Sequence, residues 1–451
     1  MNSTALGRSA PAGSTLPDMP RAAASTAWLT VLTLFLAQIV STIDRGMLAL
    51  VIDPVRADLG ISEMQIALLQ GLAFSIFYVT VGLPLGAVAD AVNRRKLLIA
   101  GIAVWSAATV AGGLAGGFGS MFASRLFIGV GEAVLGPCAV TMIADLFPPE
   151  RRGRPMALYV FGSMIAYGLG SLITGQILTL APQGVFAGLP LIGTLAPWRM
   201  AFVLVGLSGV VLLALLALLR EPVRSATATA SSGEANAGFA EGLRAMRRDY
   251  RVFLPYYAAL SLFALAGSVA TGWGAVLLTR GFGFDVGRAG KALGLAQVSW
   301  AALGALLAGV CVDWVGKRFG TVGRARFAVT LTLLAVPSAL PLFAVGPTMA
   351  IVMLGEIMFI MAIYGTTMLA ILSEIAPPSL RGFAVALYAF VMTMIGGSLG
   401  PIAVAGLTEH VLGDPAKVGW SMAIVGSAGF AASALLLLLT SSAIAARRRA
   451  A

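Results

Sequence analysis

Long apolar runs separated by short polar connections make up most of the chain from residue 27 onward. Each run has about the 20 residues that an α-helix needs to cross the hydrocarbon core of a bilayer. The pattern predicts an all-α membrane protein with twelve transmembrane helices. The expected spans are 27–52, 65–90, 96–115, 119–147, 155–180, 199–220, 253–280, 290–312, 324–345, 348–375, 382–408 and 417–441.

A polar stretch rich in Ser, Ala, Thr and charge follows the sixth run and divides the chain into two halves. We expect a disordered cytoplasmic N-terminus at 1–26 and six-helix bundles at 27–220 and 253–441. A cytoplasmic linker is expected at 221–252 and a basic cytoplasmic tail at 442–451. The first run shows no convincing cleavage site, so no removable signal peptide is predicted.

Composition agrees with a lipid environment. Hydrophobic residues make up 59% of the chain and charged residues 11%, whereas soluble domains carry roughly 25% charged residues. Cys138 and Cys311 lie in opposite halves, and the one histidine, His410, falls in a predicted external loop. Neither a metal site nor a cofactor is expected. A membrane enzyme would need a nucleophile–base pair or a ligand cluster at membrane depth, so we expect that the protein is not an enzyme.

The basic residues are arranged by side of the membrane. The net charge is +11, and arginine and lysine gather in every second connection between apolar runs. Such alternation places those loops and both termini in the cytoplasm, and we expect an inner (plasma) membrane protein with no nucleic-acid partner. The clusters are Arg94-Arg95-Lys96, Arg151-Arg152-Arg154, Arg244-Arg247-Arg248-Arg251, Lys317-Arg318-Arg324-Arg326 and Arg447-Arg448-Arg449.

Two motifs occur once in each half. Residues 86–96 and 309–319 share the pattern G-x-x-x-D-x-x-x-[RK]-R, and the short segments Pro-Pro, Arg-Gly and Ala-Leu-Tyr that follow residue 147 recur after residue 376. The doubled loop and the six-plus-six plan resemble the major facilitator superfamily, although Ala91 and Asn93 depart from its usual pattern. The resemblance implies two pseudo-symmetric bundles that work by alternating access. Such a plan needs no open pore, which argues against a channel.

Two charged pairs lie inside apolar runs: Asp44-Arg45 in the first, and Arg125 with Glu132 in the fourth. By helix rise, Asp44 lies roughly 24 Å along its helix from the cytoplasmic end, and Arg125 and Glu132 lie roughly 9 Å and 20 Å from the outer end of theirs. Arg125 and Glu132 are two turns apart on one helix face. Because both helices line the central cavity in the superfamily, we expect the four charges to form one cluster there.

Asp44-Arg45 and the segment RLFIGVGEA (125–133) resemble the spinster subfamily, which implies movement of sphingoid lipids or lysophospholipids. Charges at membrane depth are costly and usually functional. Our hypothesis is that Asp44 and Glu132 couple transport to protons, while Arg45 and Arg125 bind an anionic head group through their bidentate forks. The alternative is a static ion pair that joins the two helices.

Further candidates lie at the cytoplasmic helix ends. The resemblance implies inter-helix salt bridges that break during the transport cycle, and solvated loop charge is the alternative reading. The expected gating residues are Asp90, Arg94, Asp145, Arg152, Asp313, Lys317, Glu374 and Arg381. In the fourth span, Gly129, Gly131 and Gly136 are expected to allow close helix approach.

The second half has one deep acid, Glu356, as a secondary candidate. Its surroundings suggest an apolar bundle facing a charged one; the candidates are Trp273, Trp300, Met361, Tyr364, Met368, Phe390, Met392 and Met394. We therefore predict a monomeric, proton-coupled carrier of an amphiphilic lipid. The alternatives are a carrier of organic anions or sugar acids and a multidrug efflux transporter. Scarce Asn and Gln at membrane depth, with Gln38, Gln70, Gln176 and Gln297 as candidates, disfavours a sugar-acid site.

Overall fold

The described part of the chain is almost entirely helical. The structure is a computed structural model that describes residues 21–222, 244, 246–377 and 380–450, and no strand occurs among them. Within these ranges, eleven helices are long and apolar enough to cross a membrane. One of them covers two predicted spans, so helix is found at all twelve expected spans, although α-helix in the span expected at 324–345 ends at Ser338.

The first half contains six spans, two of which are interrupted. The second span breaks at Gly71 and the fourth at Ala133 and Val134, while the short helix α2 (Ile52–Leu59) follows the first. The spans are α1 (Arg21–Leu50), α3 (Glu63–Gln70) with α4 (Leu72–Ala91), α5 (Arg94–Gly113), α6 (Phe118–Glu132) with α7 (Leu135–Leu146), α8 (Gly153–Leu180) and α9 (Pro197–Leu218).

The second half begins with α12 (Tyr250–Phe282) and α13 (Val286–Ser338). With 53 residues, α13 is far longer than a bilayer requires. Gly320 has φ 63° and ψ −161°, a conformation open to glycine, and there α13 bends into two spans. Apart from two short 3-10 helices, η3 (Pro341–Phe343) and η7 (Pro415–Lys417), the remaining elements are α14 (Pro347–Ile375), α15 (Arg381–Phe390), the π-helix η5 (Val391–Gly396), α16 (Gly397–Gly406), the π-helix η6 (Leu407–Val411) and α17 (Val418–Ala450).

Helices extend beyond some of the predicted limits. Because α1 begins at Arg21, the predicted disorder at 1–26 is wrong for residues 21–26, where three consecutive alanines favour helix. At the other end, α17 continues to Ala450, so the predicted tail is helical rather than a separate segment. Residues 1–20 and most of the predicted linker, 223–243, lie outside the described residues.

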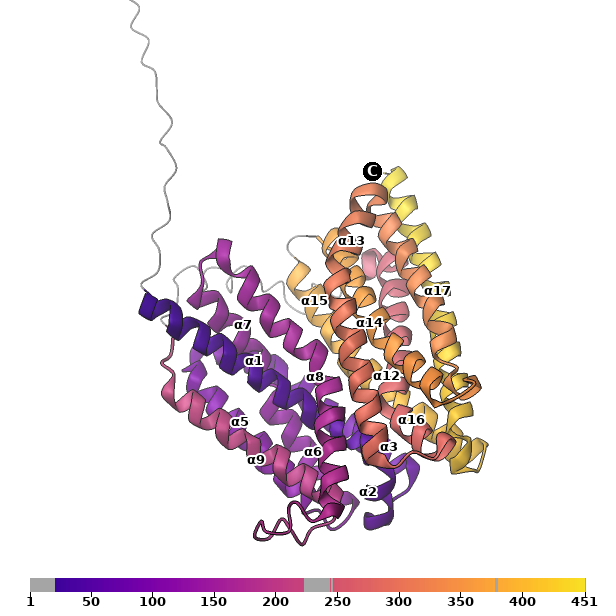
Figure 1. Ribbon diagram of the computed structural model, residues 1–451. Helices are drawn as coiled ribbons and strands as arrows, with labels where there is room; N and C mark the ends of the chain where they lie inside the picture. Colours follow the sequence, from indigo (N-terminus) through magenta and orange to yellow (C-terminus); the bar gives the residue numbers. More distant parts are fainter. Residues whose placement is uncertain (1–20, 223–243, 245, 378–379, 451) are drawn as a thin grey trace, which may run out of the picture.

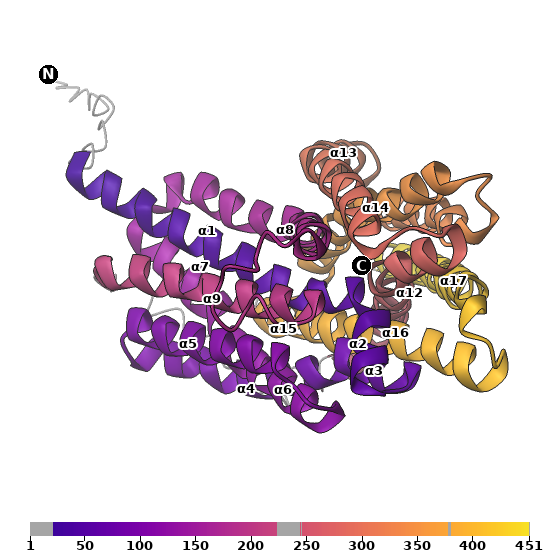
Figure 2. The ribbon, with the colours of Figure 1, turned by 60° about the horizontal axis from the view of Figure 1, so that its bottom comes forward.

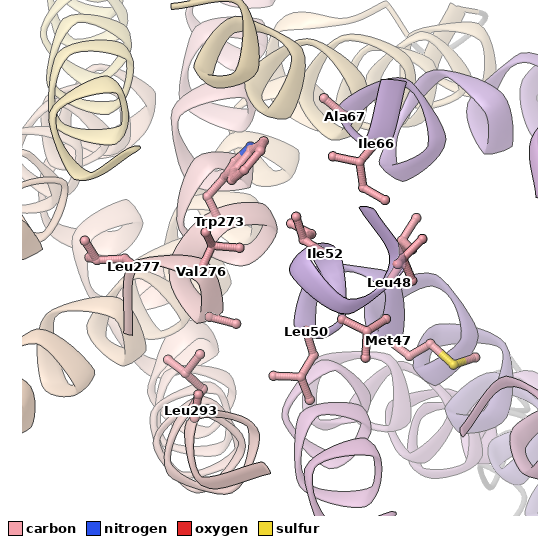
Figure 3. Packing of buried hydrophobic residues seen from close by; sticks show 14 of the residues in the cluster. Met47, Leu48, Leu50, Ile52, Ile66, Ala67, Trp273, Val276, Leu277 and Leu293 are labelled. Carbon is pink, nitrogen blue, oxygen red and sulfur yellow. The ribbon is translucent and has the colours of Figure 1, made fainter. Parts of the chain in front are cut away.

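The two bundles stand side by side (Figures 1 and 2). Each has its own apolar core, and a third core belongs to both. The shared core lies at the end of the molecule near α2 and α3, which we call the closed end. In Figure 3, Leu48, Ile52 and Ile66 of the first bundle face Trp273 and Leu293 of the second. Toward the opposite end, where α1 begins and α17 ends, the bundles lean apart (Figure 1).

Charged groups also join the bundles at the closed end. Arg280 of α12 contacts Asp53 (Nη2–Oδ1 2.5 Å) and the buried Glu63 (Nη1–Oε1 2.6 Å) of the first bundle. Arg56, on α2, pairs with Glu63 at 2.8 Å. The backbone N–H of Met64, in the first turn of α3, donates to Glu409 of η6, so a carboxylate of one bundle satisfies a helix N-terminus of the other.

The three glycines of the fourth span differ in their surroundings. A Cβ at Gly129 would lie 2.4 Å from the carbonyl oxygen of Phe74 in α4, and one at Gly131 would lie 2.6 Å from that of Gly101 in α5. Close approach is confirmed for these two. A Cβ at Gly136 would meet nothing within 4 Å, so its expected packing role is wrong, because there is room for a side chain at this position.

We therefore expect Gly129→Ala to lower stability by about 1–3 kcal/mol, the usual cost of overpacking. Gly136→Ala is the matched control and should be neutral, or stabilising by up to about 1 kcal/mol through helix propensity. Thermal unfolding of the purified variants in detergent measures both effects. Equal stability of the two variants would contradict the packing seen around Gly129.

Candidate functional site

The four charges expected to form a cluster do meet, as two ion pairs between α1 and α6. Arg45 Nε lies 2.5 Å from Glu132 Oε2, and Arg125 Nη1 lies 3.7 Å from Asp44 Oδ1. Consecutive residues of a helix point about 100° apart. Asp44 and Arg45 therefore reach different surroundings from the same turn of α1.

The pair Asp44–Arg125 is enclosed within the first bundle. Both side chains are 2% exposed. Arg125 Nη1 also donates to the backbone oxygen of Asp44 at 3.1 Å, and its guanidinium lies over the ring of Phe202. The hydroxyl of Thr109 in α5 donates to Asp44 Oδ2. The pair thus joins α1 to α5, α6 and α9.

The pair Arg45–Glu132 is open on one side only. Glu132 is fully buried, whereas the Arg45 side chain is 23% exposed. The guanidinium lies 4.8 Å from the ring centres of Phe74 and Tyr78 in α4, and its Nη2 donates to Ser41 at 3.2 Å. The aromatic faces and the carboxylate hold the cation in place, since each attracts a guanidinium.

A cavity of about 200 Å³ lies between the two bundles, and Arg45 lines it. Asp44, Arg125 and Glu132 are not among its lining residues. The expectation that all four charges face the central cavity is therefore wrong, because three of them point into the first bundle. The lining residues are Arg45, Gly46, Ala49, Gln70 and Tyr167 from the first bundle, and Ala264, Ser268, Thr271, Gly272, Met358, Met361, Met392, Gly396, Gly397 and Pro401 from the second.

Among the expected gating residues of the first half, Arg94 and Asp145 form a buried pair at 2.6 Å. Arg94 also contacts Glu221 at 3.1 Å, and the Glu221 carboxylate accepts from the backbone N–H groups that begin α5. Arg152 donates to the carbonyl oxygen of Phe147. The side chain of Asp90 lies outside what the structure describes.

The second half pairs its charges differently. Glu374 contacts Arg324 and accepts from Thr321, while Asp313, Lys317 and Arg381 are exposed at the surface. The partner of Glu374 is thus a residue that the sequence did not single out as a gating residue. Glu356, the secondary candidate, accepts a hydrogen bond from Ser338 at 2.8 Å and does not line the cavity.

Several cavity residues were missed by the sequence analysis. Ser268 and Thr271 are three residues apart on one face of α12, a spacing visible in the sequence but shared by many hydroxyl pairs. Met361 and Met392 were among the candidates and do line the cavity, whereas Trp273, Tyr364 and Met368 are buried in the cores. Within the described part of the chain, no three His, Cys, Asp or Glu residues are grouped as a metal site.

Comparison with known proteins finds relatives that are membrane transporters. A family model described as Major Facilitator Superfamily matches residues 34–401. An MFS-type efflux pump of Mycolicibacterium smegmatis is 26% identical over 389 residues, or 86% of each chain. Protein spinster of Drosophila melanogaster is 26% identical over 61% of this chain, and the match spans 43% of spinster. A probable L-galactonate transporter of Escherichia coli is 30% identical over 36% of each chain.

Solved structures show the same fold. A bacterial homologue of the human lysosomal transporter spinster, in an inward-facing and occupied conformation, has a TM-score of 0.76 at 22% identity, covering 93% of this chain and 96% of that one. Its inward-facing, unoccupied form has a TM-score of 0.74. The family match, the twelve helical spans and this likeness lead to one conclusion: the chain belongs to the major facilitator superfamily of membrane transporters and resembles its spinster members.

Proposed function

We propose that the protein is a proton-coupled secondary transporter that moves an amphiphilic anion, a lysophospholipid or a sphingoid phosphate, by alternating access. One observation carries the proposal. Of the described residues that line the cavity, Arg45 alone is charged, and its partner Glu132 is buried behind it. A cation facing a cavity between two bundles suits an anionic head group, because a guanidinium donates two parallel hydrogen bonds to a phosphate or carboxylate.

The buried carboxylate supplies the coupling in this proposal. While Glu132 is ionised, it holds Arg45 through Nε. A proton on Glu132 removes that attraction and leaves Arg45 to bind the substrate anion. When the substrate leaves, the uncompensated guanidinium favours loss of the proton, since an isolated buried charge is costly. Proton and substrate occupancy are thereby linked through one side chain.

The second pair has a supporting role. Asp44 and Arg125 are enclosed by Thr109 and Phe202, too deep in the bundle to touch the cavity in this conformation. Asp44 remains a candidate for proton coupling because it occupies the same turn as Arg45. Arg125 fixes the turn of α1 that presents Arg45. The pair Asp44–Arg125 is therefore interpreted as a static ion pair that joins two helices.

Alternating access needs one end closed while the other opens. Arg280 bridges the bundles at the closed end, and Arg56 remains beside Glu63 and Asp53 when Arg280 withdraws. The carboxylates then keep a partner, which lowers the cost of opening. At the other end, the pairs Arg94–Asp145 and Arg324–Glu374 each stay within one bundle. With the basic loops in the cytoplasm, the conformation described opens inward, across an inner (plasma) membrane.

Support for a lipid comes from the second bundle. Met358, Met361 and Met392 line the cavity opposite Arg45, and methionine is a flexible apolar side chain that adapts to varied hydrocarbon shapes. The second candidate is a sugar-acid carrier, favoured by the polar groups of Gln70, Ser268 and Thr271 in the same cavity. Arg45 argues against export of cationic drugs.

We expect Glu132→Gln to abolish proton-driven transport while substrate binding persists, because the amide cannot ionise and Arg45 is free to bind an anion. Accumulation driven by a pH gradient should fall about tenfold or more, given the several kcal/mol carried by such buried pairs. This accumulation is measured as uptake of labelled lysophosphatidate into proteoliposomes with and without a pH gradient. The exposed Glu150 provides the control Glu150→Gln. An unchanged response to pH in Glu132→Gln refutes the coupling role.

Removal of the bridging cation at the closed end should shift the conformational equilibrium. Arg280→Gln is expected to populate a form with this end open, because Asp53 and Glu63 keep only Arg56. Spin labels at Ala57 and Ala416, in a background without Cys138 and Cys311, would report longer distances by electron resonance. Arg288→Gln is the control, since Arg288 lies on the same surface against Phe284. Identical distance distributions in both variants would count against this bridge.

The two arginines of the cluster should differ in structural importance. Arg125→Met is expected to destabilise the protein by about 3–5 kcal/mol, the cost of leaving a buried charge unpaired, and adding Asp44→Asn should restore part of the loss. Arg45→Met should lower stability by less, because the Arg45 side chain reaches the cavity. Thermal unfolding in detergent compares the three variants. A larger loss for Arg45→Met than for Arg125→Met would show that these assignments are reversed.

A further inference from the structure

The cavity carries a set of polar groups besides Arg45, and they come from both bundles. Gln70 is the last residue of α3, while Ser268 and Thr271 lie one turn apart on α12. A Cβ at Gly272 would lie only 2.9 Å from Gln70 Oε1. The amide of Gln70 therefore rests on the backbone of α12 beside Thr271, which brings these polar groups together on one part of the wall.

The hydrogen bonds of these groups determine which of them can still donate and which can still accept. Ser268 donates its hydroxyl hydrogen to the carbonyl of Leu265 at 2.8 Å, and Thr271 donates to the carbonyl of Ser268 at 3.1 Å. Both hydroxyl oxygens are then left as acceptors. Gln70 Nε2 is buried and has no hydrogen-bond partner among the described residues. This part of the wall thus offers one amide donor next to two hydroxyl acceptors.

Arg45 completes the arrangement. The hydrogen bonds that it makes to described residues use Nε, to Glu132, and Nη2, to Ser41. Its Nη1 is not used in either bond. A buried amide donor without a partner is unfavourable, so a ligand group that accepts from Gln70 Nε2 removes that cost on binding.

We propose that the cavity holds a hydroxyl subsite beside Arg45 and that the substrate is an anion carrying a hydroxyl group close to its charge. The hydroxyl oxygen accepts from Gln70 Nε2, and its hydrogen is donated to Ser268 or Thr271. The inference rests on the proposed function, which makes this cavity the substrate site. A hydroxyl is the smallest group that both accepts and donates; an ether or ester oxygen would leave the hydroxyl acceptors unused, and a methylene would leave the amide unpaired.

The cavity volume sets how much of the substrate is enclosed. About 200 Å³ equals roughly seven water volumes, enough for a small charged head and its hydroxylated linker. A longer apolar chain has to leave this space past Met358, Met361 and Met392. The hydroxyl subsite is therefore a property of the head group and is shared by hydroxylated lipid phosphates and by free sugar acids.

A pair of matched probes tests the subsite on the full-length protein in nanodiscs. The probes are 1-oleoylglycerol 3-phosphate and its 2-deoxy analogue, which lacks only the hydroxyl. We expect the wild type to bind the hydroxylated probe about tenfold more tightly, the discrimination typical of a site with an otherwise unpaired donor. Gln70→Leu should lower affinity for the hydroxylated probe by a similar factor and leave the deoxy analogue nearly unchanged. Gln176→Leu, on the exposed face of α8, is the control.

A second variant keeps the test decisive if Gln70→Leu folds poorly. Gly272→Ala places a Cβ against the Gln70 amide and should reduce discrimination in the same direction. Galactonate, measured in parallel, separates the two sources of substrate. Gln70-dependent binding of galactonate without binding of either lipid supports the hydroxyl subsite and assigns it to a free sugar acid.

The remaining outcomes separate the two proposals. Two outcomes overturn the hydroxyl subsite while leaving an anion site at Arg45. One is equal wild-type affinity for both lipid probes without Gln70-dependent binding of galactonate. The other is an equal loss of affinity for both lipid probes in Gln70→Leu. Absence of binding by all three anions overturns the proposed function, and the subsite with it. Discrimination that persists in both Gln70→Leu and Gly272→Ala also overturns the assignment to Gln70.

Discussion

Charges placed in apolar surroundings must be paired, and this requirement organises the first bundle. Asp44 and Arg45 are adjacent on α1, yet each pairs with a different residue of α6, because the helix turns their side chains about 100° apart. One pair is enclosed by α5 and α9; the other reaches the space between the bundles. A single turn of α1 therefore serves both the internal order of the bundle and the cavity.

The two halves share a sequence repeat but have different electrostatics. The repeated loop brings Arg94 to Asp145 in the first half, whereas in the second half Glu374 is paired with Arg324 from beyond the loop. The central wall differs as well: a guanidinium on one side faces methionines and hydroxyls on the other. The structural repeat supplies two similar scaffolds, and the side chains divide the chemistry unequally between them.

Much of the fold follows from the sequence, because a bilayer imposes a length on every apolar run. The meeting of α1 and α6 charges could also be expected, since unpaired charges are costly at that depth. The sequence could not predict which of these charges face the cavity, because that depends on how each helix is rotated within its bundle. The same holds for Gly136, whose neighbours depend on packing, and for Arg324, which lies 50 positions from its partner. A hydroxyl such as that of Ser268 cannot be recognised as a cavity residue from the sequence, because this depends on which helix lies opposite it.

The π-helical segment η5 has a mechanical consequence. It interrupts the eleventh span at Val391–Gly396, and two of its residues, Met392 and Gly396, line the cavity. A π-helix contains a wider turn than an α-helix and is frequently found at functional sites. If the segment tightened to α-helical geometry, the residues on one side of it would rotate about the axis by about 100° for each residue absorbed. The two parts of the span on either side of the cavity would in that way change their rotation relative to one another.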